Sequence, residues 1–165
     1  MRVTFTRTKQ RGYSLTIKRT DIDTAVMDPA PGYHDRLPHD AAHFIVENEL
    51  GILGGIFGQM AQGGILRPAE GDTQVQRKAK RKRETIFKAN KDDALFSEHA
   101  VWAAQSRWEK QAIVPDTKIP QSDLDRIAQK FEAFAAEWSK LPIGGAITLE
   151  WAPKQIETFT QALGS

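Results

Sequence analysis

Apolar and polar side chains alternate along two runs near the N-terminus, over residues 3–7 and 13–19. Both runs have a period of two and are rich in β-branched and aromatic residues, which predicts β-strands. The segment between them, residues 9–12, is polar and ends in the glycine that a turn favours. The pattern predicts an N-terminal β-hairpin with one apolar face and one basic, threonine-rich face. A similar alternation at 146–151 predicts a late strand.

Helix signals mark five further segments. Pro38 suits the first turn of a helix, and Gly51 is a typical stop, so a helix is expected over 38–51. Residues 52–66 are apolar but rich in glycine, and they predict a short buried helix. The most regular amphipathic pattern follows a Ser-x-x-Asp start signal at Ser122 and continues to Leu141.

Another helix is expected from about residue 92 to 111. Its predicted buried face comprises Leu95, Phe96, Ala100, Trp102, Ala103 and Trp108. Pro153 is expected to open a terminal helix that carries Ile156, Phe159 and Leu163.

These elements together predict an α+β fold of one domain, residues 1–165. A small antiparallel sheet, formed by the hairpin and the late strand, is expected to be covered by three to four helices. No alternation of strands and helices suggests a doubly wound sheet.

Composition narrows the classes of function. The chain has 165 residues, of which 40% are hydrophobic, and its net charge is +2. It contains no cysteine, which excludes disulfides, thiolate metal ligands and a cysteine nucleophile. No apolar segment resembles a signal peptide or a membrane span, so a cytoplasmic protein without membrane association is expected.

Positive charge is concentrated in a basic segment near 67–85, expected to be a mobile loop or a solvated helix extension. Its densest part carries Arg77, Lys78, Lys80, Arg81, Lys82 and Arg83. Six cations among seven residues could neutralise several phosphates of DNA, RNA or another polyanion. The alternative is a solvated segment that serves solubility. No aromatic residue lies within the run to stack on bases.

Candidate chemistry is concentrated in the helix expected at 38–51. His39 and His43 are four residues apart, so both imidazoles lie on one helix face and can reach one zinc or other divalent ion. Glu47 lies one turn further along, too far to join both on the same ion. A third ligand is expected from elsewhere, with His34, Asp35 and His99 as candidates.

Two other interpretations of this helix remain open. In one, His39 and Asp40 form helix-start polar contacts, His43 is a hydrogen-bonded, partly buried histidine, and Glu47 and Glu49 are solvated. In the other, Asp40 and Glu47 are catalytic carboxylates of a pocket without a metal.

The motif H-D-x-x-H at 39–43 resembles the H-E-x-x-H helix of zinc metallopeptidases. The resemblance implies that the two histidines are zinc ligands and that Asp40 is the general base. Asp40 is one methylene shorter than the glutamate of that family. Val46 stands where one branch has a glycine, so a continuous helix would carry Glu49 away from the metal.

A longer string is similar to a group of small uncharacterised bacterial proteins. It comprises residues 27–33, 37–40, 43–47, 55–59 and the glycine pair at 63–64. The resemblance implies a bacterial, cytoplasmic protein and carries no known activity. Two functions are therefore expected as alternatives: a divalent-metal protein, hydrolytic in character, or a non-catalytic module that binds nucleic acid or protein through 77–83.

Overall fold

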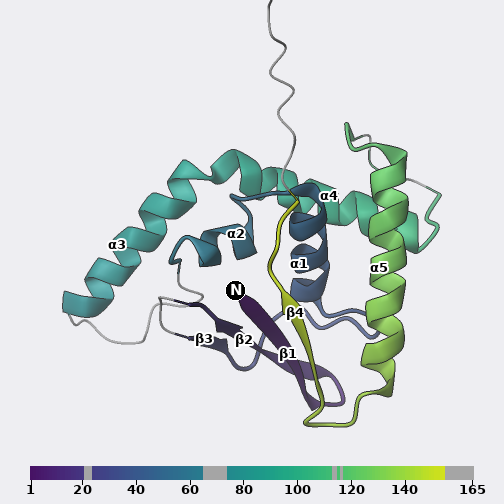
Figure 1. The fold of residues 1–165 in the computed structure, drawn as a ribbon, viewed down its shortest axis with the longest axis horizontal. Helices are drawn as coiled ribbons and strands as arrows, with labels where there is room; N and C mark the ends of the chain where they lie inside the picture. Colours follow the sequence, from purple (N-terminus) through teal and green to yellow (C-terminus); the bar gives the residue numbers. More distant parts are fainter. Residues whose placement is uncertain (21–23, 65–73, 113–114, 116, 155–165) are drawn as a thin grey trace, which may run out of the picture.

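The computed structural model describes residues 1–20, 24–64, 74–112, 115 and 117–154 (Figure 1). Four antiparallel strands form one sheet in the order β3-β2-β1-β4. Their bounds are β1 (Arg2–Lys9), β2 (Gly12–Lys18), β3 (Ala25–Met27) and β4 (Ala146–Glu150). The predicted hairpin is β1 and β2, and the predicted late strand is β4, which pairs with the other edge of β1. The three residues of β3 are too few for alternation to reveal, so this strand was not predicted.

Five helices occur within the described residues. Their bounds are α1 (His39–Leu50), α2 (Ile56–Ala61), α3 (Gln74–Ala89), α4 (Lys91–Trp108) and α5 (Gln121–Lys140). The predicted α+β fold, with the hairpin and the late strand in one antiparallel sheet, is confirmed. The terminal helix expected after Pro153 falls in 155–165, outside the described residues. Among the described helices, none has the length and apolar character needed to cross a bilayer.

The apolar face of the sheet packs against α1 and α5. Phe5 of β1 makes edge-to-face contacts with Phe44 of α1 and Phe134 of α5, at centroid distances of 6.3 and 5.6 Å. Tyr13 of β2 meets Trp138 of α5 in the same way. Each large side chain buried in this way stabilises the fold by about 1.5–3 kcal/mol. The period-two pattern of the strands thus determines which face α1 and α5 cover.

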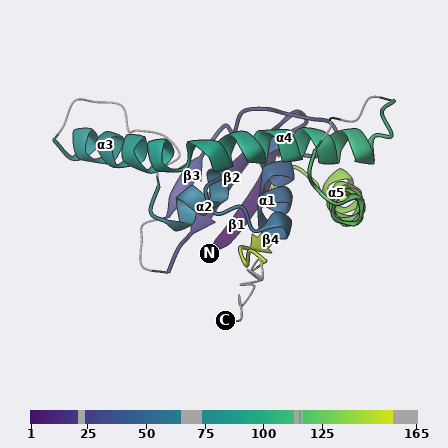
Figure 2. The same cartoon turned by 90° about the horizontal axis from the view of Figure 1, so that it is seen from above.

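Helix α1 lies at the centre of the molecule, beside α2, α4 and α5 (Figures 1 and 2). Nearly all of its side chains are buried, including the charged or polar ones of Asp40, His43, Glu47 and Glu49. A helix covered on every side shows no amphipathic stripe, because it has no solvent face. Its polar residues must therefore find partners inside the protein.

Helix α4 corrects the predicted buried face. Ala100, Ala103 and Trp108 are buried as expected. The exposed residues are Leu95, Phe96 and Trp102, at 56%, 43% and 53%. Small side chains form most of the buried face, and they allow α4 to approach α1 and α5 closely. The prediction gave most weight to large apolar residues and therefore did not identify this face.

The start of α5 also differs from the prediction. The helix begins at Gln121, and its N-cap residue, Pro120, makes no side-chain hydrogen bond to the first turn. Asp125, the expected capping partner of Ser122, binds Arg107 of α4 at 2.7 Å instead. An ion pair to the neighbouring helix has replaced the local cap.

Part of the basic segment lies in α3, so the helix alternative holds for residues 74–85. Residues 67–73 lie outside the described part of the chain. Helix α3 precedes α4 and extends away from the sheet and α5 (Figures 1 and 2). The six cations of 77–83 are exposed on it.

Candidate metal centre

Helix α1 follows the predicted limits. Pro38 stands before its first residue, and Gly51 ends it in a left-handed conformation with φ of 65°. The rings of His39 and His43 lie on one face, with centroids 4.6 Å apart. Helical spacing alone brings these two imidazoles together, as the sequence predicted.

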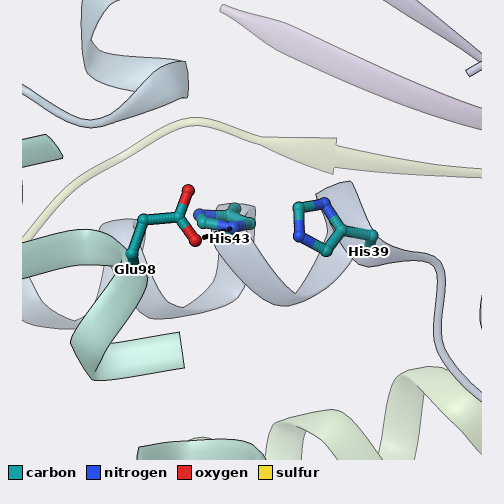
Figure 3. Close-up of side chains that lie close together, drawn as sticks. All are labelled: His39, His43 and Glu98. Atoms are coloured by element: carbon teal, nitrogen blue, oxygen red, sulfur yellow. Dashed lines mark ion pairs between the residues drawn. The ribbon is translucent and has the colours of Figure 1, made fainter. Parts of the chain in front are cut away.

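Glu98 of α4 completes the group (Figure 3). One ligand atom from each of His39, His43 and Glu98 lies within 4.8 Å of the others. His43 Nε2 is 3.6 Å from Glu98 Oε2. Two donors bound to one tetrahedral zinc ion stand about 3.4 Å apart, because each bond is about 2.1 Å long. The His43–Glu98 pair is already spaced for one ion, and the 61% exposed Glu98 side chain has room to turn toward His39.

A chain of hydrogen bonds determines which nitrogen of His43 carries the proton. Ser97 Oγ donates to Glu47 Oε1 at 2.8 Å, so its single proton is committed to that carboxylate. The 3.2 Å contact between Ser97 Oγ and His43 Nδ1 must then be donated by the ring nitrogen. In the neutral imidazole, Nε2 is left with a lone pair. This lone pair belongs to a buried atom that has no hydrogen-bond partner among the described residues.

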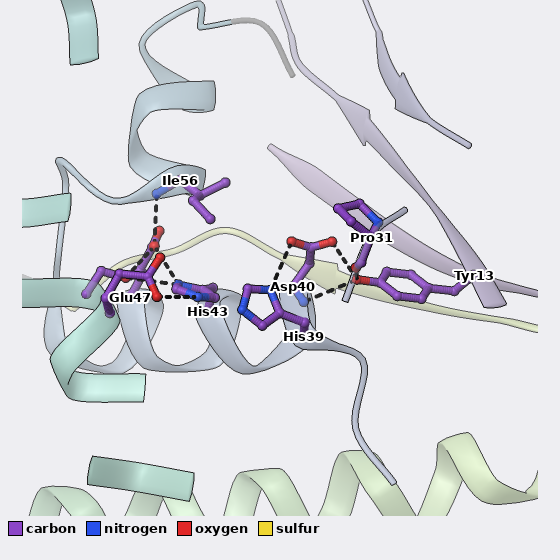
Figure 4. Close-up of polar contacts among 9 residues, drawn as sticks. Tyr13, Pro31, His39, Asp40, His43, Glu47 and Ile56 are labelled. Atoms are coloured by element: carbon purple, nitrogen blue, oxygen red, sulfur yellow. Dashed lines mark hydrogen bonds and ion pairs between the residues drawn. The ribbon is translucent and has the colours of Figure 1, made fainter. Parts of the chain in front are cut away.

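Asp40 holds the other histidine from the opposite side (Figure 4). Its Oδ1 is 3.8 Å from His39 Nδ1, and its Oδ2 accepts a 2.6 Å hydrogen bond from the hydroxyl of Tyr13. The Asp40 carboxylate raises the pKa of His39, against the opposing effect of burial. Burial and the same carboxylate raise the pKa of Tyr13, which keeps its phenol protonated as a donor. The arrangement leaves Nε2 of His39 available as a ligand.

Glu47 lies behind His43 and also anchors α2. Its two carboxylate oxygens accept the backbone N–H groups of Ile56 and Phe57 at 2.9 and 2.8 Å, in addition to the Ser97 hydroxyl. These N–H groups belong to the first turn of α2 and have no partner within that helix. A Cβ on Gly55 would approach this carboxylate to 2.2 Å, so only glycine fits there without a shift. Glu47 is fully occupied by these contacts and supports His43 from behind.

Each histidine is therefore paired with a carboxylate on the Nδ1 side: His39 with Asp40 directly, and His43 with Glu47 through Ser97. Metal-binding histidines characteristically donate this second ring nitrogen to such partners, which fixes the ring orientation. The contacts of Asp40 observed here orient His39 and do not test its predicted role as a general base, which stays a prediction.

The other predicted third ligands lie elsewhere. His34 Nδ1 accepts the backbone N–H groups of Arg36 and Leu37, and its Nε2 faces Glu109 at 3.6 Å. Asp35 faces Arg11, and His99 is exposed on α4. None of the three belongs to the group formed with His39 and His43, within the part of the chain that the structure describes.

Glu49 is carried away from the candidate ligands by the uninterrupted helix, as Val46 predicted. Its buried carboxylate binds Arg126, Lys130 and Lys154. Burial alone would raise the pKa of Glu49, but the three cations outweigh it and lower the pKa to about 2. This cluster ties α1 to α5 and to the segment after β4.

A pocket of about 350 Å³ opens beside the candidate ligands. His39, Asp40 and Glu98 contribute to its lining, together with apolar side chains from β3, α2 and α3. A small molecule could therefore reach an ion held by the two histidines and Glu98.

Glu98 is the residue that the sequence did not reveal as a ligand. It stands between Ser97 and His99 in a helix, 55 positions after His43, and nothing in that local pattern distinguishes it from a solvent-exposed glutamate. Comparisons with family models, curated proteins and solved structures found no match. The function is therefore inferred from these side chains alone.

Proposed function

We propose that the protein binds one divalent metal ion, zinc or a similar ion, through His39, His43 and Glu98, and uses it for hydrolysis. The observation that carries the proposal is the buried Nε2 of His43, which has no hydrogen-bond partner among the described residues and lies 3.6 Å from Glu98 Oε2. Burying a nitrogen lone pair without a partner costs about 1–3 kcal/mol. A metal ion would remove this cost and would also balance the charge of Glu98.

The donor set suits this chemistry. Two imidazoles and one carboxylate occupy three positions and leave at least one for water or substrate, as in catalytic zinc sites. A divalent ion there acts as a Lewis acid and lowers the pKa of a coordinated water. Asp40 and Ser97, with Glu47 behind it, would keep the two rings in place. The pocket beside them would admit the substrate.

Metal content is the direct test. Protein purified without chelators is expected to contain near one equivalent of a divalent metal, or to take it up from zinc, iron(II), manganese or cobalt salts. His39→Ala and Glu98→Gln should each lose the metal, and both change partly exposed side chains. His99→Ala is the matched control, because it removes an exposed histidine from the same helix and should leave the metal content unchanged.

The result that would reject this function is equally direct. Folded wild-type protein that neither contains nor binds any of these metals would exclude the site. Equal loss of metal in His99→Ala and Glu98→Gln, with both variants folded by circular dichroism, would show that Glu98 is not a ligand.

A second candidate function is binding of nucleic acid through α3. The observation that favours it is the exposure of all six cations of 77–83 on a helix that projects from the rest of the protein (Figure 1). Such binding weakens steeply with salt, because each neutralised phosphate releases counterions. Replacing the six cations with glutamine should abolish binding of an oligonucleotide in 100 mM salt. Unchanged binding would reject this function.

A further inference from the structure

The basic helix and the candidate metal centre meet at one residue. Arg83, the last of the six cations, lines the same pocket as His39 and Glu98. It is the only lysine or arginine among the described residues that line this pocket. The features that suggested two alternative functions are therefore parts of one site.

The charges of the pocket depend on the metal. Without an ion, the carboxylates of Asp40 and Glu98 make the pocket unfavourable for an anion. A divalent ion would balance these two carboxylates, and Arg83 would then give the pocket a net positive charge. A guanidinium beside a metal ion suits a ligand group with several anionic oxygens, and phosphate has this geometry.

An aromatic side chain stands next to this cation. Phe87 is four residues after Arg83 on α3, so the two share a helix face, and it lines the same pocket. Its side chain is 55% exposed. An exposed aromatic ring beside a phosphate site is the arrangement on which a nucleic-acid base stacks.

The face that carries Arg83 continues along α3 away from the pocket. Lys80 is three residues earlier and therefore lies one turn further out on the same side. A strand whose phosphate sits at Arg83 could thus continue along Lys80. Arg81, by contrast, is two residues from Arg83 and points to the other side of the helix.

We propose that the metal pocket binds a phosphate of a single-stranded nucleic acid, with Arg83 recognising the phosphate and Phe87 stacking on the adjacent base. This inference rests on the proposed metal site and names its substrate class. The bond that the site would hydrolyse is a phosphodiester. In its hydrolysis, water oxygen bonds to phosphorus, the P–O ester bond breaks, and a water proton passes to the leaving oxygen.

The test uses the whole protein loaded with zinc and a fluorescein-labelled single-stranded 12-mer of thymidine, with the dissociation constant measured by fluorescence anisotropy. Arg83→Gln should weaken binding about tenfold, because a charge-assisted contact is lost. Phe87→Leu should weaken it about fivefold, because it removes stacking but keeps an apolar side chain. Arg81→Gln, the same charge change on the opposite face, should weaken it by no more than about threefold.

Metal removal separates this inference from the proposed function. Chelation should weaken binding by wild type much more than binding by Arg83→Gln, since ion and guanidinium hold the same phosphate. Arg83→Gln should keep its zinc, because Arg83 is not a ligand.

Equal effects of Arg83→Gln and Arg81→Gln in zinc-loaded protein would overturn the inference and leave the metal site standing. Competition by inorganic phosphate that requires Arg83, with oligonucleotide binding that does not, would assign the pocket to a small phosphate compound and overturn the nucleic-acid assignment. Absence of zinc binding would reject the proposed function itself.

Discussion

Ser97 is the residue through which Glu47 controls His43, and its replacement by alanine tests the hydrogen-bond chain. Ser97 is buried, and it donates to Glu47 at 2.8 Å while accepting from His43 Nδ1 at 3.2 Å. Ser97→Ala removes both bonds. Glu47 keeps two backbone donors, so its charge is not left unpaired. The loss is one charge-assisted bond and one weak bond.

The expected magnitude follows from these contacts. A bond to a charged group contributes about 1.5–3 kcal/mol, and the longer bond adds less. His43 Nδ1 lies 3.7 Å from Glu47 Oε1, and by moving closer it can recover part of the stabilisation lost with the two hydrogen bonds. We therefore expect the free energy of unfolding to fall by about 2 kcal/mol. For a chain of this length, the melting temperature should fall by about 4–8 °C.

Metal affinity should fall as well. Loss of a hydrogen-bond partner behind a metal-binding histidine typically weakens binding about 10–100-fold. Competition against a zinc chelator of known affinity would measure this loss, and urea unfolding of the metal-free protein would measure the stability.

Ser106→Ala is the matched control for Ser97→Ala. Ser106 is also buried on α4, but its hydroxyl donates to the neutral side chain of Gln111 at 3.1 Å. We expect a cost of about 1 kcal/mol and no change in zinc affinity. Equal zinc affinities for Ser97→Ala and Ser106→Ala would refute the proposed role of the hydrogen-bond chain.

Three further predictions concern stability. The folded-state pKa of Glu49 is lowered to about 2, so its contribution is present above the unfolded pKa near 4.5 and is lost as pH falls toward 2. Allowing for solvent around the partly exposed lysines, we expect the contribution of Glu49 to the free energy of unfolding, measured with urea, to fall by about 2 kcal/mol between pH 7 and 2.5. A Glu49→Gln variant should already lack this contribution at pH 7, and its stability should lack this part of the pH dependence. Gly55→Ala places a Cβ 2.2 Å from the buried Glu47 carboxylate and should lower the free energy of unfolding by more than 2 kcal/mol in the same assay. A Gly55→Ala variant as stable as the wild type would contradict this close contact. Arg7 donates to two carbonyls at the end of α5, so Arg7→Met should lower the free energy of unfolding by about 1–2 kcal/mol. Arg2→Met removes only an exposed ion pair and should lower it by less than about 0.5 kcal/mol. Equal losses in the two variants would refute this distinction.

Local signals predicted much of the fold because they act over a few residues. The alternation of Val3 and Phe5 with threonines produced β1, and Pro38 and Gly51 marked the ends of α1. Local signals failed where a neighbouring element competed. Asp125 binds Arg107 rather than capping α5, and Leu95, Phe96 and Trp102 of α4 are exposed because mostly small residues of this helix pack against its neighbours.

The residues of the candidate site likewise fall into those that local spacing predicts and those that depend on tertiary packing. His39 and His43 were found from the sequence because a helix places residues four apart on one face, whatever the rest of the chain does. Glu98 and Ser97 could not be found in this way. Their positions depend on how α4 crosses α1, which packing of the small residues on α4 decides.

The sequence by itself determined the hairpin strands, the late strand, the limits of α1, the pair of histidines and the run of cations, since each depends on spacing along a single element. Only the tertiary structure decided that Glu98 faces His43, that Glu47 is committed to α2 and Ser97, and that Arg83 shares a pocket with His39. The physical reason is that contacts between elements depend on the burial and shape of surfaces distant in sequence. No local pattern records that information.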